Sequence, residues 1–408
     1  MGSGPALRRA SQTDYQQELL GMKITDIEVT LLANPDLDPL ACDSAQDAAL
    51  VRIHTDEGIV GISEVDATPR VVKAFLDAPS GHSFSMGMRD LLLGEDPRDV
   101  RRLWHKVYDA TIMSARRGMG VHVIGAIDLA LWDIFGKAMD APVWKLLGGA
   151  RQPHVTPYAS ILPKGQLGDE MLADTTRRMQ QVREEGFTAA KIEPVPEVTR
   201  DDDDVVEMVR RSREALGPDI VLMVDVGYRW RDAKTALRTI RRFEEYDVYF
   251  LETPVQIDKL EASAELSRRI EIAIACGELN AGRQEFIELM DRGGVDIAQP
   301  DVPRAGGLTE SLRVAEAAED RGKLVVPHAW NTGITTAAAV QLAAASANCP
   351  YIEYLPPSMY TAGLRKDLLA SEPALVDGII ALPEAPGLGI ELDLDAVEHY
   401  RIDEVAVV

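Results

Sequence analysis

From His154 to Tyr354, short apolar runs alternate along the chain with amphipathic stretches. The apolar runs have the length and composition of strands, and the stretches between them have helical spacing. Strands separated by helices form a parallel sheet with right-handed crossovers, and eight of them favour a closed barrel. The alternative is an open doubly wound sheet, which is weakened because no glycine fingerprint follows an early strand. The eight predicted strands are HVTPYAS, TAAKIE, IVLMVD, VYFLE, IAIACGE, VDIAQPD, LVVPH and YIEY.

A different pattern precedes these strands. The segment KITDIEVTLL alternates as a strand does, and AALVRIHTDEGIVGISEV indicates two strands around a turn at Asp56 to Gly58. Residues 97–117 and 121–140 have helical periodicity, with Ile124, Ile127 and Leu131 on one face. The N-terminal part is therefore predicted to be a small antiparallel sheet with helices.

These patterns divide the chain into four parts. Residues 1–21 are polar and contain Gly and Ser, so we interpret them as a tag or disordered extension. Residues 22–148 form the predicted α+β domain, and residues 149–385 form the barrel. Residues 386–408 are punctuated by Pro and Gly and are expected to return to the N-terminal sheet.

Composition narrows the possible functions. The formal net charge of −23 excludes unassisted binding to nucleic acid or to an anionic membrane, whereas a small anionic substrate stays possible beside a bound cation. The three cysteines, Cys42, Cys276 and Cys349, are widely spaced and odd in number, which indicates a reducing compartment. We identify no apolar run that approaches the roughly 20 residues needed to span a bilayer. We therefore expect a cytoplasmic protein.

Three of the predicted strands end in a carboxylate, at nearly equal intervals along the chain: Asp225, Glu252 and Glu278. The carboxyl ends of parallel barrel strands converge on one mouth, where such barrels carry their chemistry. Three carboxylates meeting there repel one another unless a cation lies between them, and oxygen-only ligands suit Mg²⁺. The alternative is that each acid ends its strand and pairs with a local Lys or Arg, which is a weaker explanation for three acids in register.

Polar residues also end the later strands: Asp301, His328 and Glu353. Their spacing predicts that His328 neighbours Asp301, and a carboxylate on one ring nitrogen makes the other nitrogen a better general base. A purely structural histidine is the alternative. Earlier in the barrel, Lys191 and Glu193 lie two residues apart and point to the same face. Lys191 is a base, an electrostatic clamp or the counter-ion of Glu193.

With these residues identified, the sequence resembles the enolase superfamily and, within it, the mandelate racemase subgroup. The resemblance extends from Met22 to the C-terminus. It is carried, in order, by TDEGIVGISE, AIDLALWDIFGKAMDAPVWKLLGG, MVD, LETP, CGEL, QPDVPRAGGLTE, VPHAWNTGI and PGLGIELD.

The resemblance implies an α+β capping domain over a modified (β/α)₇β barrel, which is a modified TIM barrel. It implies Mg²⁺ on Asp225, Glu252 and Glu278, with His328 and Asp301 as the base, and Glu353 as a hydrogen-bond partner of a substrate carboxylate. The sequence departs from the family pattern at Lys191-Ile192-Glu193, where a Lys-x-Lys pair is common and the second Lys is a base. It departs again at Val226-Gly227-Tyr228, because Asn often stands two residues after the first metal ligand.

We expect this site to remove the proton alpha to a carboxylate of a sugar acid and to eliminate the beta hydroxyl as water. The resemblance supports this expectation, since a Lys or His base acting with Mg²⁺ is the general chemistry of the superfamily. Because Glu193 is normally anionic at neutral pH, we do not expect a two-base racemase. The alternatives are a cycloisomerase of a sugar-acid lactone or anhydro sugar acid, an epimerase, and a non-catalytic binding protein, which would need neither His328 nor Asp301.

Substrate preference is expected to lie in the irregular segments 33–47 and 78–88, which the family uses as lids. His82 and Ser83 are candidate substrate contacts, together with Trp330, Lys191 and Glu353. We also expect a homo-oligomer, between a dimer and an octamer.

Overall fold

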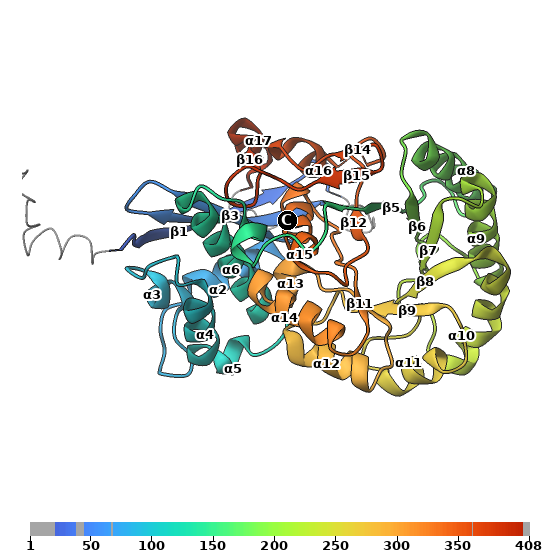
Figure 1. The fold of residues 1–408 in the computed structure, drawn as a ribbon, viewed down its shortest axis with the longest axis horizontal. Coiled ribbons are helices and arrows are strands. Elements are labelled where there is room, and N and C mark those ends of the chain that lie inside the picture. The colour runs from blue at the N-terminus through green and yellow to red at the C-terminus, as the bar shows by residue number, and fades with distance from the viewer. Residues whose placement is uncertain (1–20, 38–44, 67, 361, 403–408) are drawn as a thin grey trace, which may run out of the picture.

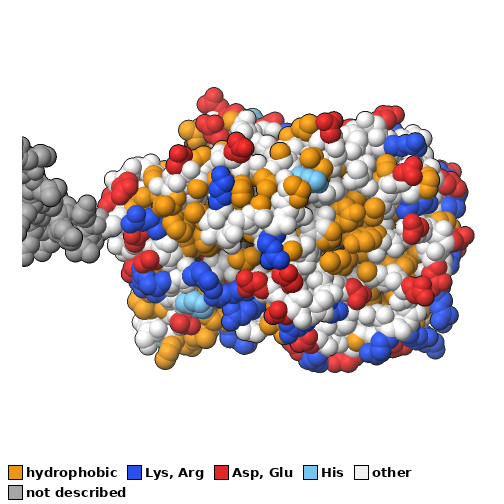
Figure 2. Space-filling view, in the orientation of Figure 1, with side chains coloured by type: hydrophobic (Ala, Val, Ile, Leu, Met, Phe, Trp, Pro, Cys, Tyr) orange, Lys and Arg blue, Asp and Glu red, His pale blue; other side chains and the backbone are white. Residues whose placement is uncertain are grey.

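The computed structural model describes residues 21–37, 45–66, 68–360 and 362–402. The extension at residues 1–20, part of the segment 33–47, and Cys42 thus lie outside the described residues, so the predictions made for them stay predictions. The other two cysteines, Cys276 and Cys349, are buried and free. On the face shown in Figure 2, acidic and basic side chains are interspersed, so the net charge is not carried there by one acidic patch.

The N-terminal part contains the predicted antiparallel sheet, in the order β1, β2, β3. Its strands are β1 (Ile24–Ala33), β2 (Asp47–Thr55) and β3 (Val60–Val65). Helices lie beside this sheet on the left of Figure 1. They are α2 (Pro69–Asp77), α3 (Met88–Leu92), α4 (Val100–Ala110), α5 (Ile112–Ala115), α6 (Met119–Ala138) and α7 (Val143–Leu146).

The helix predicted over residues 97–117 is interrupted. Thr111 ends α4, where its hydroxyl and its N–H both donate to the carbonyl of Val107. Gly118 then adopts a positive φ of 56°, which glycine tolerates without steric cost, and α6 starts at the next residue. The second predicted helix is confirmed as α6.

Helix α6 corrects the sequence prediction about apolar runs, because its 20 residues are by length and composition enough to cross a membrane. Most of α6 is buried inside the protein, where it contacts β3, α4 and two barrel helices. Gly61 and Gly125 permit these contacts: a Cβ at Gly61 would lie 2.1 Å from the carbonyl oxygen of Ala130, and one at Gly125 would lie 1.9 Å from that of Pro303. We therefore identify α6 as the core helix between the two parts of the chain.

The second part is an eight-stranded parallel sheet curled into a barrel (Figure 1). Strands β5 to β11 pair in sequence, β12 pairs with β5, and the Glu353 N–H donates to the Pro327 carbonyl beyond β11. The strands are β5 (Pro157–Ile161), β6 (Ala189–Ile192), β7 (Val221–Asp225), β8 (Val248–Glu252), β9 (Ala273–Cys276), β10 (Ile297–Ala298), β11 (Leu324–Val325) and β12 (Ile352–Tyr354).

A barrel helix follows each of the first seven barrel strands, whereas the eighth, β12, leads into the short helix α16 (Gly363–Asp367) of the C-terminal part, which gives the predicted (β/α)₇β order. The modified TIM barrel with an α+β capping domain is thus confirmed. The helices are α8 (Asp169–Glu184), α9 (Asp202–Leu216), α10 (Ala233–Ile240) with the 3₁₀ turn η1 (Arg241–Tyr246), α11 (Leu260–Ser267), α12 (Arg283–Asp291), α13 (Val302–Ala305), α14 (Gly307–Glu319) and α15 (Gly333–Ala345).

Most barrel strands are shorter than their sequence patterns, and three of them contain or precede a proline. HVTPYAS divides at Pro157: β4 (His154–Val155) pairs with β15 (Ile379–Ala381) beside β14 (Leu375–Val376), while β5 enters the barrel. Pro300 and Pro327 follow β10 and β11 closely, and neither can donate to a ladder. Proline therefore accounts for where these three strands divide or end.

The described part of the C-terminal segment contacts the capping domain. It contains β16 (Glu391–Leu392) and α17 (Leu394–Tyr400), and β16 pairs with β13 (Leu369–Ser371), which follows α16 (Gly363–Asp367) before this segment. The Leu388 N–H donates to Asp133 of α6, and the Ile402 N–H donates to the Leu31 carbonyl of β1. The exact domain limits at residues 148 and 385 remain a prediction.

The interior of the barrel has two layers. A lower, apolar layer contains one residue from each of seven strands, among them Tyr158, Met223 and Phe250. Because side chains alternate along a strand, the residues two positions later point inward above this layer. Six of those seven later residues are polar, Ser160, Lys191, Asp225, Glu252, Gln299 and His328, and the seventh is Gly277.

Candidate functional site

The three predicted metal-binding carboxylates lie on adjacent strands. Asp225 ends β7 and is the register partner of Glu252, which ends β8, and Glu278 follows β9 by two residues. Asp225 is 8% exposed and Glu252 is fully buried. The shared strand register brings these acids to one end of the barrel, as the sequence spacing predicted.

Each carboxylate has a different set of neighbours. Asp225 accepts hydrogen bonds from the Thr253 hydroxyl (2.6 Å) and the Gly227 N–H (2.9 Å). Glu278 accepts one from the Tyr228 hydroxyl at 2.8 Å. Glycine is required at position 227, because φ is +55° and a Cβ would lie 2.7 Å from the Val195 side chain. The departures at Gly227 and Tyr228 thus hold two of the acids in place.

The donor set fits a hard divalent cation. Among the described residues, no three Asp, Glu, His or Cys side chains lie close enough together to form a complete metal-binding site as they stand. However, Glu252 Oε1 is buried without a hydrogen-bond partner, which is costly for a carboxylate oxygen. Burial and repulsion from Asp225 raise the pKa of Glu252 to about 8, although Lys191 opposes the shift. A cation between these oxygens would relieve both penalties.

His328 and Asp301 are brought together as predicted. Asp301 Oδ2 lies 2.9 Å from His328 Nδ1, and Asp301 Oδ1 accepts from the Arg304 N–H at 3.0 Å. An ionised Asp301 can only accept, so Nδ1 carries a proton and Nε2 is the nitrogen available for chemistry. That Nε2 atom lies 3.1 Å from Glu278 Oε2. Burial opposes protonation of His328, but Glu353, Asp301 and Glu278 raise its pKa well above the usual range.

Sequence reasoning missed an ion pair behind this dyad. Arg304 donates to both carboxylate oxygens of Asp66, which lies in the capping domain just after β3. The same guanidinium lies 3.4 Å from the carbonyl of Glu278. Arg304 follows Asp301 by three residues, one helical turn, which was a usable signal. Nothing in the sequence pointed to Asp66.

Lys191 is surrounded by four acids. Its Nζ lies 2.7 Å from Glu353 and 3.0 Å from Glu252, but 3.8 Å from both Glu193 and Asp225. Burial lowers the pKa of Lys191, but Glu252 and Glu353 raise it well above the usual range. Of the three roles left open by the sequence, the structure favours a counter-ion, shared among several acids, over a neutral base.

The protonation state of Glu193 differs from the prediction, which was that this side chain is an anion at neutral pH. Burial, together with repulsion from Asp225 and Glu353, raises the pKa of Glu193 well above its usual range, although Lys191 opposes the shift. Its Oε1 atom lies 2.6 Å from the hydroxyl of Ser160, a residue that sequence reasoning also missed. The alternation of β5 above Tyr158 could have identified Ser160.

The remaining predicted substrate contacts lie in two places. Trp330 is half-buried two residues after His328, and its ring packs edge-on against Tyr360 with centroids 5.6 Å apart. His82 and Ser83 lie in an exposed turn of the capping domain. The hydrogen bonds of His82 are local, to Phe84 and Ser85. Trp330 is thus near His328 along the chain and packs on Tyr360, whereas the hydrogen bonds of His82 stay within its own turn.

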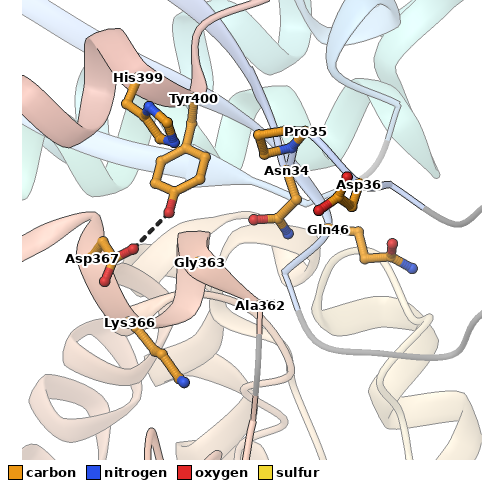
Figure 3. Close-up of a pocket in the computed structure, with 10 residues that line it drawn as sticks. All are labelled: Asn34, Pro35, Asp36, Gln46, Ala362, Gly363, Lys366, Asp367, His399 and Tyr400. Carbon is orange, nitrogen blue, oxygen red and sulfur yellow. Dashed lines mark hydrogen bonds between the residues drawn. The ribbon is translucent and has the colours of Figure 1, made fainter.

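A pocket of about 530 Å³ lies elsewhere, between the end of β1 and helices α16 and α17 (Figure 3). Asn34, Lys366 and His399 line it, and the Tyr400 hydroxyl donates to Asp367 at 2.6 Å. None of the predicted catalytic or metal-binding residues lines this pocket, whereas Asn34, Pro35, Asp36 and Gln46 of the segment 33–47 do.

A buried carboxylate of the capping domain also holds the segment after His328. Glu64 of β3 accepts hydrogen bonds from the hydroxyl of Thr332 and from the hydroxyl and N–H of Thr335. Thr332 caps α15, only four residues after His328. Glu64 thus joins the capping domain to the segment that carries the dyad.

Glu64→Gln should change how stability depends on pH. Burial raises the pKa of Glu64 from 4.5 to about 7, although the threonine hydrogen bonds oppose the shift. The native state then holds this proton more tightly, so Glu64 contributes stability below pH 4.5 that is lost as pH rises through 7. The variant lacks this dependence. As pH rises from 4.5 to 7, the free energy of unfolding of the variant, measured in urea titrations, should therefore increase by roughly 3 kcal/mol relative to that of the parent.

The matched control is Glu57→Gln in the exposed turn between β2 and β3, which should follow the parent at every pH. A constant difference between Glu64→Gln and the parent across the pH range would contradict the prediction.

Comparison with known proteins finds relatives that match nearly the whole chain. Residues 27–148 match the family described as mandelate racemase / muconate lactonizing enzyme, N-terminal domain, and residues 174–396 match enolase C-terminal domain-like. The chain is 32% identical over 392 residues to D-galactarolactone cycloisomerase of Agrobacterium fabrum, covering 94% of this chain and 100% of the relative. It is 30% identical to arabinonate dehydratase of Saccharolobus solfataricus, covering 90% and 95%. The crystal structure of 3,6-anhydro-D-galactonate cycloisomerase from Zobellia galactanivorans superimposes with a TM-score of 0.82 at 30% identity, covering 93% and 100%.

Proposed function

Because this chain belongs to the mandelate racemase and muconate lactonizing enzyme group of the enolase superfamily, we propose that it is a Mg²⁺-dependent dehydratase of a sugar acid. The relatives support an enzyme that acts on sugar acids or their lactones, since two are named arabinonate dehydratase and D-xylonate dehydratase and one D-galactarolactone cycloisomerase. The single observation that carries the proposal is the His328 and Asp301 dyad, in which Asp301 contacts Nδ1 and Nε2 lies 3.1 Å from Glu278, a predicted metal ligand.

Each residue has a role in this proposal. Asp225, Glu252 and Glu278 would hold the cation, which when bound neutralises the negative charge that develops on the substrate carboxylate. His328 Nε2 takes the proton alpha to that carboxylate, because Asp301 fixes the proton on Nδ1. His328 then returns the proton to the departing beta hydroxyl, which leaves as water. Lys191 holds the substrate carboxylate, and Glu353, 2.7 Å from Lys191 Nζ, contacts the substrate beside it.

In D₂O, the true substrate should give a 2-keto-3-deoxy acid and no epimer at C2, because elimination makes C2 a carbonyl carbon. A screen of sugar acids with Mg²⁺, followed by mass spectrometry and NMR of the product, measures this. A C2 epimer carrying solvent deuterium as the main product would contradict dehydration and leave epimerisation.

A cycloisomerase is the second candidate, favoured by two of the relatives. Cycloisomerisation starts from a lactone or anhydro sugar acid and conserves the mass of the substrate, whereas dehydration loses water. The same screen therefore separates the two reactions.

Three further proposals concern the setting of the site. His82 and Ser83 would contact substrate when the segments 33–47 and 78–88 cover the barrel mouth. The protein would act in the cytoplasm, and it would assemble as a homo-oligomer.

A further inference from the structure

The hydroxyl of Ser160 lies between two carboxylates. Its Oγ atom is 2.6 Å from Glu193 Oε1 and 2.6 Å from Glu353 Oε1, and all three side chains are buried. A hydroxyl has one proton and can donate to only one of two acceptors. The other carboxyl group must therefore carry a proton of its own and donate it to Oγ.

The neighbours of the two carboxyl groups decide which of them is protonated. Glu353 accepts from the Ala329 N–H at 2.8 Å and lies 2.7 Å from Lys191 Nζ. Glu193 has Lys191 only at 3.8 Å, beyond hydrogen-bond reach. Ser160 thus donates to Glu353, and Glu193 donates to Ser160.

The charged groups that face Glu193 support a neutral acid. Lys191 approaches from its own strand, Asp225 from β7 and Glu353 from β12. The hydroxyl of Tyr360, beyond β12, donates to the backbone carbonyl of Ser160 at 2.8 Å. Burial, added to the two acids, outweighs the single lysine and raises the pKa of Glu193.

The three side chains follow one another around the barrel. Glu353, Ser160 and Glu193 come from the consecutive strands β12, β5 and β6, and His328 comes from the end of β11 on the other side of Glu353. His328 Nε2 lies 3.8 Å from Glu353 Oε2. The protonated end of the series, Glu193, is therefore the end remote from the base.

We propose that Glu193, Ser160 and Glu353 form a proton wire, and that Glu193 gives its proton to the beta carbon of the enol left by dehydration. This inference rests on the proposed function. Loss of water leaves an enol that must gain a proton at C3 and lose one from its hydroxyl to become the keto acid. The C–H bond at C3 forms with the proton of Glu193. The enol hydroxyl proton enters at Glu353 and passes through Ser160 to Glu193, so the wire is restored and no other reactant is needed.

The protonation of Glu193 is testable without substrate. In infrared spectra of the Mg²⁺-loaded protein at pH about 8, the parent should show the C=O band of a protonated carboxylic acid, and Glu193→Gln should lack it. Ser160→Ala should keep the band at a higher frequency, because the acid loses its hydrogen-bond acceptor. Glu214→Gln, at the exposed end of α9, is the matched control and should keep the parent band. An identical protonated-acid band in the parent and Glu193→Gln would overturn the wire.

Product stereochemistry tests the transfer to carbon. In D₂O, the parent should place deuterium on one face of C3, whereas Glu193→Gln and Ser160→Ala should give both configurations because the enol ketonises in solution. Substrate consumption should fall less than about tenfold, since His328 is intact. Single-face labelling in both variants would overturn the transfer. If the parent forms no keto acid, the proposed function fails, and the infrared spectra still decide whether Glu193 is protonated.

Discussion

Replacing His328 with Asn should reduce turnover by at least about 10³-fold, the largest effect expected of any single substitution in this protein. The asparagine amide can still donate to Asp301, so the dyad geometry is imitated while the base is lost. No second group replaces it. Lys191 is held as a cation among four acids, and Glu193 lies on β6, remote from the end of β11.

Steady-state kinetics on the substrate identified by the screen measure this loss, with circular dichroism to check the fold. His54→Asn is the matched control, because His54 lies on β2 of the capping domain beside Glu28 and should leave turnover unchanged. A His328→Asn variant within about tenfold of the parent would show that another residue is the base.

Removing the divalent cation should abolish activity, and Mg²⁺ should restore it. The reason is the number of buried carboxylates: without a cation, the charge that forms on the substrate would meet Asp225, Glu252 and Glu278 at one end of the barrel. Chelation followed by elemental analysis, activity assay and calorimetric titration with Mg²⁺ measures the effect. Full activity in protein shown to be free of metal would contradict it.

Glu252→Gln separates the cation site from the fold. The amide has the same shape and removes one ligand charge, so Mg²⁺ affinity should fall by roughly 100-fold or more. The fold should persist, since a neutral side chain replaces an acid whose pKa burial raises to about 8. Glu261→Gln, on the surface helix α11, is the matched control. Unchanged Mg²⁺ affinity in Glu252→Gln would remove Glu252 from the ligand set.

The sequence predicted what repeats along the chain. Strand period placed Asp225, Glu252 and His328 at one end of a barrel, because every βα unit has nearly the same length. It could not predict Asp66 beside Arg304, since that pair joins two parts of the chain that only tertiary packing brings together. Nor could it predict a neutral Glu193, because protonation depends on burial and on acids from other strands.

The apolar layer below the site limits the routes by which substrate can reach the site and product can leave it. Tyr158, Met223 and Phe250 fill the barrel beneath the polar layer, so the chamber is blind at that end. In the proposed reaction, substrate, released water and product would all pass the opposite end of the barrel, where Glu64 and Asp66 attach the capping domain. Entry and exit would then share a single route, and the segments proposed to select the substrate would also set how fast its product leaves.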